Sequence, residues 1–159
     1  MAAPSRIATA PGVTVNIASL AVQRAFGQRS RLLDTDAEGS DTWDRALAKV
    51  NTPSFTVTNL ELFERLTALE QLRLAFGDDF WPRMNKVTRQ KWMSNGYHPT
   101  RETAYDNLAL FASITANADL RGFFSAWGMP VTEQGRAAIA DLNLPLPATD
   151  PTTLREPRP

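Results

Sequence analysis

Histidine and cysteine, the side chains that most often bind transition metals, are almost absent. The chain has one histidine, His98, and no cysteine among its 159 residues. A zinc-binding H-E-x-x-H helix needs two histidines one turn apart, so this sequence cannot form one. His98 precedes Pro99 in a turn-like stretch, and no G-x-S-x-G nucleophile elbow accompanies it. We therefore interpret His98 as a structural or solvated residue, in preference to a member of a Ser-His-Asp relay.

An acidic loop is the next candidate for a metal site. Asp34, Asp36 and Glu38, followed by Gly39, match the first half of a calcium-binding loop, in which oxygen ligands alternate and a glycine makes the turn. The twelfth position of such a loop is a bidentate glutamate, but here it is Arg45. Because a guanidinium group repels calcium, we favour a solvated acidic loop that leads into a capped helix.

Two pairs of neighbouring carboxylates could serve as catalytic acids. Glu61 and Glu64 form one pair, and Asp78 and Asp79 form the other. Both pairs lie where helices are predicted to begin, and a negative charge there complements the positive end of the helix dipole. We favour this structural role, although paired catalytic acids meet through the fold and the sequence leaves that alternative open.

Basic residues crowd one predicted helix beside Trp92. They are Arg83, Lys86, Arg89 and Lys91. A nucleic-acid-binding stripe is one interpretation, but the chain balances 17 basic against 17 acidic residues. We therefore favour a solvated face and expect no nucleic-acid partner. No segment approaches the roughly 20 apolar residues that span a bilayer, so we expect no membrane partner either.

Apolar residues at helical spacing, bounded by capping and stop signals, predict the elements that position these side chains. The clearest helix ends at Gly77, and Thr58 and Glu61 are predicted to form its capping box. Residues 13–17 are also compatible with a strand, although the pattern that continues to Phe26 favours a helix. The predicted helices cover, approximately, residues 14–26, 43–50, 58–76, 80–95, 100–116, 119–127 and 132–142.

The predicted fold is all-α, an irregular bundle of about six or seven helices with an extended Pro-rich C-terminal tail. Residues 1–12 are expected to be a loose lead-in, residues 13–145 the helical domain, and residues 146–159 the tail, either extended or disordered. Tryptophans are expected to anchor the core rather than line a ligand site. They are Trp43, Trp81, Trp92 and Trp127.

Two stretches together resemble a known family. The first is V-T-V-N-I-A-S-L-A-V-Q from residue 13, and the second combines F-G-D-D-F-W from residue 76 with F-F-S-A-W-G from residue 123. Their order and spacing are similar to those of the enhancin-like and mucin-targeting zinc metallopeptidases, which are gluzincins of peptidase family M-sixty. The resemblance spans most of residues 13–145.

The resemblance implies zinc as the cofactor of the family but no zinc ligand in this chain. In the family, an H-E-x-x-H helix supplies two ligands and the general base, and a glutamate just before the V-T-x-N stretch supplies the third ligand. That glutamate corresponds to Gly12, and the H-E-x-x-H helix would lie before Met1. The expected identity is therefore the C-terminal helical part of such a peptidase, which is non-catalytic by itself.

The resemblance also implies partners. An upstream segment that carries the zinc helix is the expected partner, and proteins or mucin-type glycoproteins are the expected substrates. A stand-alone protein- or glycoprotein-binding helical module is the alternative, and an unrelated hydrolase or structural protein is a third possibility. The stand-alone part should expose an apolar face, and Asn16 and Trp81 are expected to lie nearest the cleft. The family is commonly secreted or at the cell surface, although residues 1–12 contain no signal-peptide core.

Overall fold

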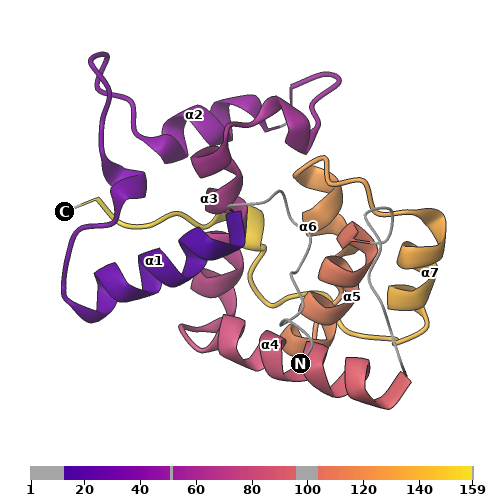
Figure 1. The fold of residues 1–159 in the computed structure, drawn as a ribbon. Coiled ribbons are helices and arrows are strands. Elements are labelled where there is room, and N and C mark those ends of the chain that lie inside the picture. Colours follow the sequence, from indigo (N-terminus) through magenta and orange to yellow (C-terminus); the bar gives the residue numbers. More distant parts are fainter. Residues whose placement is uncertain (1–12, 51, 96–103, 159) are drawn as a thin grey trace.

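The computed structural model describes residues 13–50, 52–95 and 104–158, and over these residues the fold is all-helical. The predicted irregular bundle is confirmed, and the strand alternative for residues 13–17 is wrong because they begin a helix. The helices, shown in Figure 1, are α1 (Val13–Ala25), η1 (Arg31–Leu33), α2 (Thr42–Lys49), η2 (Val57–Asn59), α3 (Leu62–Phe76), α4 (Phe80–Asn95), α5 (Ala104–Ala116), α6 (Arg121–Ala126), α7 (Glu133–Ala140) and η3 (Pro151–Thr153). Within this part of the chain, no helix is long and apolar enough to span a bilayer.

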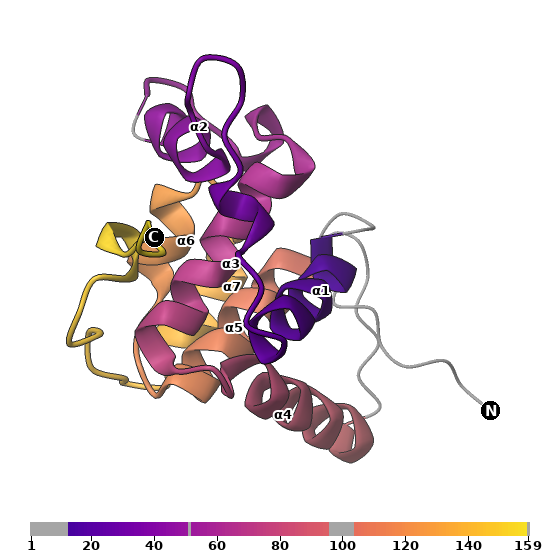
Figure 2. The ribbon, with the colours of Figure 1, turned by 90° about the vertical axis from the view of Figure 1, so that its left-hand side faces the viewer.

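Helix α3 is the centre of the molecule (Figures 1 and 2). Helices α1 and α2 pack on it, and the tail contacts it through η3. Helix α4 follows α3 and packs mainly on α5, which in turn packs on α7. The core runs through all these interfaces, and its largest fully buried side chains include Trp43, Phe80 and Trp127.

The tryptophans are core residues, as predicted, wherever their side chains are described. Trp43 and Trp127 have no exposed surface, and Trp81 is 6% exposed. The side chain of Trp92 lies outside the described residues, as do His98 and Gly12.

The predicted capping box at Thr58 is wrong, because helix α3 begins three residues later than expected. Thr58 lies in the 3-10 turn η2, where its hydroxyl contacts Thr56 Oγ1 at 2.5 Å. The cap of α3 is formed by Glu61, whose backbone N–H donates to Glu64 Oε2 at 2.8 Å. A short turn with its own side-chain hydrogen bonds therefore precedes the helix.

Gly128 ends α6 at a close approach between two backbone segments. Its φ is +56°, a left-handed conformation, and its carbonyl accepts a hydrogen bond from Val57 N at 3.1 Å. A Cβ at this position would lie 2.7 Å from Thr56 Cα and 2.8 Å from Phe55 O. Glycine is therefore required both by the conformation and by the space.

We expect Gly128→Ala to lower the free energy of unfolding by about 2–4 kcal/mol, because left-handed strain and overpacking each cost about 1–2 kcal/mol or more. Urea denaturation followed by circular dichroism measures the change. Gly122→Ala is the control, because its Cβ would meet no atom within 4 Å and its φ is not positive. Equal stability of the two variants would contradict this explanation.

The C-terminal tail is extended, as predicted, but it is not disordered. Its residues 150–158, which we call the strap, cross α3 and form hydrogen bonds with Asp44 of α2 (Figure 1). Pro151 and Glu156 in the strap are buried. The burial of these two side chains shows that the strap is part of the packed structure.

Candidate functional site

A cavity of about 310 Å³ lies between α1 and α4. Its walls are mostly apolar, and three polar side chains, Arg24, Asp78 and Asn85, join them. The apolar lining consists of Ile17, Ala18, Ala21, Trp81 and Pro82. A small, mainly apolar cavity with a few polar groups at its wall is typical of a site for an apolar side chain or a small ligand.

The structure places Trp81 in the wall of this cavity and Asn16 outside it. Successive residues of a helix are rotated by about 100°, so Asn16 lies on the flank of α1 opposite to Ala18 and Ala21. The two residues proposed to line one cleft are therefore not brought together around this cavity. A binding role for either residue remains a prediction.

Helix α1 and the residue that follows it, Phe26, form an apolar stripe on the outer side of the molecule. Val15, Val22 and Phe26 are 72%, 54% and 76% exposed, and Ala18 and Ala25 on the same face are also exposed. We call these five residues the exposed stripe. The opposite face of the helix buries Ile17 and Leu20 against the core. An apolar face on each side of one helix is the pattern of an element that packs against two bodies.

Around the buried Glu70, a network of charged side chains joins α1, α3 and the residues just before α4. Glu70, which has no exposed surface, accepts from Arg24 at 3.0 Å and from Arg73 Nε at 2.6 Å. Arg73 also donates to Asp78 at 2.6 Å. Burial by itself would lower the pKa of Arg73, but the charge and hydrogen bond of Glu70 together with Asp78 raise it above its usual value. The network fixes α1, and with it the exposed stripe, relative to α3.

The acidic loop has no geometry for calcium. Asp36 accepts hydrogen bonds from the backbone of Glu38 at 3.1 Å and of Ser40 at 2.8 Å. Arg45, at the position of the calcium-binding glutamate, pairs with Asp36 at 2.7 Å. The hydrogen bond from Ser40 and the pair with Arg45 hold the pKa of Asp36 below its usual value. The loop is thus solvent-exposed and leads into helix α2, which Asp41 caps, as the sequence favoured.

The described residues do not fit a zinc ion. Among them, no group of three or more histidine, cysteine, aspartate or glutamate side chains could hold a metal. Zinc hydrolases usually supply three protein ligands. Gly12, the position that the family resemblance assigns to the third ligand, lies outside the described residues.

The neighbouring carboxylates, and Arg83 of the basic helix α4, form ion pairs and hydrogen bonds within the fold. Glu64 is 2% exposed and binds Lys49 at 2.7 Å, and Asp79 pairs with Arg83 at 3.0 Å. Arg83 also donates to the carbonyls of Phe76 and Thr115. These contacts support the predicted roles at helix N-termini and give Arg83 a structural role.

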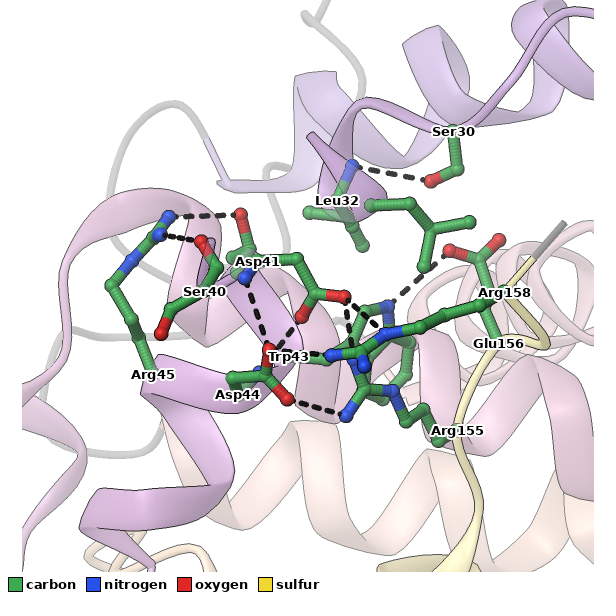
Figure 3. Close-up of polar contacts among 12 residues, drawn as sticks. Ser30, Leu32, Ser40, Asp41, Trp43, Asp44, Arg45, Arg155, Glu156 and Arg158 are labelled. Atoms are coloured by element: carbon green, nitrogen blue, oxygen red, sulfur yellow. Dashed lines mark hydrogen bonds and ion pairs between the residues drawn. The ribbon is translucent and has the colours of Figure 1, made fainter. Parts of the chain in front are cut away.

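A second polar cluster, which the sequence did not predict, joins the strap to the start of α2 (Figure 3). Arg155 donates to Asp41 at 2.5 Å and to Asp44 at 2.7 Å, and Arg158 donates to the same carboxylates at 3.2 and 2.5 Å. We call these four residues the clasp. The hydrogen bond from Arg155 holds the pKa of Asp44 below its usual value, with the backbone N–H of Asp41 as the next cause.

Two uncharged side chains of the core, Gln71 and Trp43, also donate hydrogen bonds to the strap. Gln71 Nε2 donates to the carbonyls of Thr152 at 3.0 Å and Leu154 at 2.8 Å, and Gln71 Oε1 accepts from Trp127 Nε1 at 2.8 Å. Trp43 Nε1 donates to Glu156 at 3.4 Å. Two core tryptophans are therefore connected to the strap, one directly and one through Gln71.

The lowered pKa of Asp44 predicts that the clasp is lost in acid. A carboxylate whose folded pKa is depressed contributes stability above its unfolded pKa of about 3.9, and that stability disappears as the pH falls through the folded pKa. We expect the Asp44→Asn variant to have a lower free energy of unfolding than the wild type near neutral pH. On acidification, the free energy of unfolding should fall less in the variant than in the wild type. Urea denaturation midpoints measured between about pH 7 and pH 3 give the dependence of stability on pH for both proteins. The same dependence of stability on pH in both proteins would contradict a stabilising role for the Asp44 carboxylate.

Comparisons with known proteins agree with this fold. The model of the family described as Peptidase M60, enhancin and enhancin-like, matches residues 8–128. A solved structure of a functionally unknown conserved protein from Bacillus anthracis strain Ames is 31% identical with a TM-score of 0.72, and a mutant protein solved under the same description has 31% identity and a TM-score of 0.74.

The similarity to these structures covers most of this chain but only part of theirs. In both cases it covers 87% of this chain and 27% of the other, so the chain spans about a quarter of their length. No curated protein matches the chain. The family model matches well over half of the sequence, across α1 to α6. The chain therefore belongs to the enhancin and enhancin-like peptidase family.

Proposed function

We propose that this chain is the C-terminal helical part of an enhancin-like zinc peptidase, non-catalytic by itself, and that it acts by packing against a segment that carries the zinc helix. The observation that carries the proposal is the exposed stripe on α1. Helix α1 begins next to position 12, to which the resemblance assigns the third zinc ligand. Its outer side is thus the expected place for the metal-bearing segment.

The energy available from such packing is large. Burying an exposed valine or phenylalanine side chain contributes about 1.5–3 kcal/mol, and the stripe exposes Val15, Val22 and Phe26. The buried network around Glu70 supports this role, because it holds α1 in place before any partner binds. A preformed apolar face loses little conformational entropy on binding.

The test is complex formation with a segment of an enhancin-like peptidase that contains H-E-x-x-H. Size-exclusion chromatography with light scattering should show a one-to-one complex, and protein or mucin cleavage should require both parts. Failure of the segment to bind at concentrations well above about 10 µM would count against the proposal, since a specific interface of this kind binds more tightly.

The exposed stripe also favours the second candidate, a stand-alone module that binds proteins or mucin-type glycoproteins. An apolar face serves either role, so the two candidates differ only in the partner. Binding of mucin or casein by the chain alone, without cleavage and without competition from the peptidase segment, would favour this second function.

A further inference from the structure

The cavity between α1 and α4 has room for one large side chain. Its volume of about 310 Å³ lies at the lower end of the range for ligand sites, roughly 300–1,000 Å³. Two of the residues that line it from α1, Ala18 and Ala21, are exposed, whereas Ile17 and Trp81 in its wall are buried. The short alanine side chains leave the space open, and the two buried side chains give it an apolar surface.

The charges at the cavity are already paired within the chain. Arg24 binds Glu70 at 3.0 Å, and Asp78 binds Arg73 at 2.6 Å. The remaining polar residue of the lining, Asn85, is uncharged. The described lining residues therefore offer no unpaired charge that would attract an anion or a cation. The mainly apolar wall favours an uncharged, apolar occupant.

The wall of the cavity is incomplete at Trp81. The indole N–H groups of Trp43 and Trp127 donate within the fold, to Glu156 and Gln71 respectively. The indole N–H of Trp81 is buried and has no hydrogen-bond partner in the part of the chain that the structure describes. Buried donors without a partner are uncommon in folded proteins. This side of the cavity is therefore not fully satisfied by the described residues.

The cavity adjoins the exposed stripe, because Ala18 belongs to both. An element that packs on the stripe therefore passes the mouth of the cavity. If this element left the cavity empty, it would enclose a void, and an enclosed void costs free energy in proportion to its volume. The two solved relatives have enough chain for such an element, because the part that matches this chain is only 27% of theirs. The covering element is thus expected to fill the cavity with a side chain of its own.

We propose that the segment which packs on the exposed stripe inserts one large apolar side chain, that of a leucine, methionine or phenylalanine, into the cavity between α1 and α4. This inference rests on the proposed function for the source of the side chain. It adds the class of residue that is recognised and the residues that recognise it. Ala18 and Ala21 provide the space, and Ile17 and Trp81 provide the apolar contact. A charged side chain at that position of the segment is excluded, because its charge would find no partner in the cavity.

The first test needs only this chain and a small mimic of one apolar residue. N-acetyl-L-phenylalaninamide is titrated into the isotope-labelled chain, and the indole N–H resonances are followed by NMR. The Trp81 resonance, assigned by its loss in Trp81→Phe, should shift and saturate with a Kd on the order of 1 mM, as expected for a ligand of this size. Trp43 and Trp127 do not line the cavity, so their resonances should stay in place. No saturable shift, or an equal shift with N-acetylglycinamide, which lacks the side chain, would overturn the proposal.

The second test fills the cavity by substitution. Ala21→Leu places a larger side chain at the cavity without changing a residue of the exposed stripe, and Ala137→Leu, at an exposed position of α7, is the matched control. Affinity for the segment that contains H-E-x-x-H, measured by calorimetry, should fall at least about tenfold in Ala21→Leu, because the two side chains would compete for one space. The control should keep the affinity of the wild type. The NMR shift with N-acetyl-L-phenylalaninamide should also disappear in Ala21→Leu.

The outcomes separate this inference from the proposed function. If the segment binds the wild type and Ala21→Leu equally well, the inference is overturned and the exposed stripe is left as the interface. If the segment does not bind the wild-type chain, the proposed function is contradicted, and with it the source of the side chain. The titration with N-acetyl-L-phenylalaninamide then still decides whether the cavity accepts an apolar side chain.

Discussion

Replacing Glu70 by glutamine should lower the free energy of unfolding by about 3–5 kcal/mol, since breaking a buried ion pair leaves an uncompensated charge. Glu70 has no exposed surface and binds two guanidinium groups, those of Arg24 and Arg73. Glutamine keeps the shape of the side chain and removes its charge. Arg24 would then lose the charge that it pairs with, and Arg73, only 7% exposed, would keep Asp78 and Glu156 but lose its fully buried partner.

Urea denaturation of Glu70→Gln measures the loss, and Asp79→Asn is the matched control. The Asp79–Arg83 pair has side chains 69% and 42% exposed, so the same chemical change should cost about 0–1 kcal/mol. Similar losses in the two variants would mean that burial does not decide the strength of these pairs. The Glu70 network would then not be what holds α1 in place.

Substituting serine for both Val22 and Phe26 should weaken binding of the zinc-bearing segment at least a hundredfold, on the order of 3 kcal/mol or more. Both side chains are exposed, so the stability of the free chain should change by about 0.5 kcal/mol or less. Calorimetric titration measures the affinity and urea denaturation the stability.

Leu146→Ser is the control for the stripe variant, because it makes the same kind of change at a 79% exposed leucine outside α1. Its affinity for the segment should be that of the wild type. Unchanged affinity in the Val22→Ser, Phe26→Ser variant would mean that the exposed stripe is not the interface. The zinc-bearing segment would then have to bind another face of the chain.

Much of the helical fold could be predicted because its signals are local. Leu66, Leu69 and Leu72 repeat at helical spacing along α3, and Gly77 with a φ of +100° ends that helix where the sequence placed its stop. The exact start was missed, because the hydrogen bonds of Thr56 and Thr58 depend on the preceding turn.

The buried polar residues of α3 could not be predicted. Glu70, Gln71 and Arg73 resemble the solvated positions of an amphipathic helix, and only the packing of α1 and the strap around α3 buries them. Some of their partners lie far away in the sequence: Arg24 is 46 residues from Glu70, and Leu154 is 83 residues from Gln71. A periodic pattern carries no information about such pairs.

The sequence did not indicate how the two residues that it singled out lie relative to the cavity, for a similar reason. Trp81 was singled out from the aromatic turn before α4, and it lines the cavity. Asn16 was chosen for its place in the sequence, but the rotation of α1 puts it on the other flank.

The most direct test of the account is calorimetric titration of the purified chain with zinc, with casein and mucin cleavage assayed on the same sample. The account predicts no stoichiometric zinc binding and no cleavage, because the described residues offer no ligand set and the chain supplies only one histidine. Tight one-to-one zinc binding with cleavage that a chelator abolishes would contradict it, since the chain would then be a complete peptidase by itself.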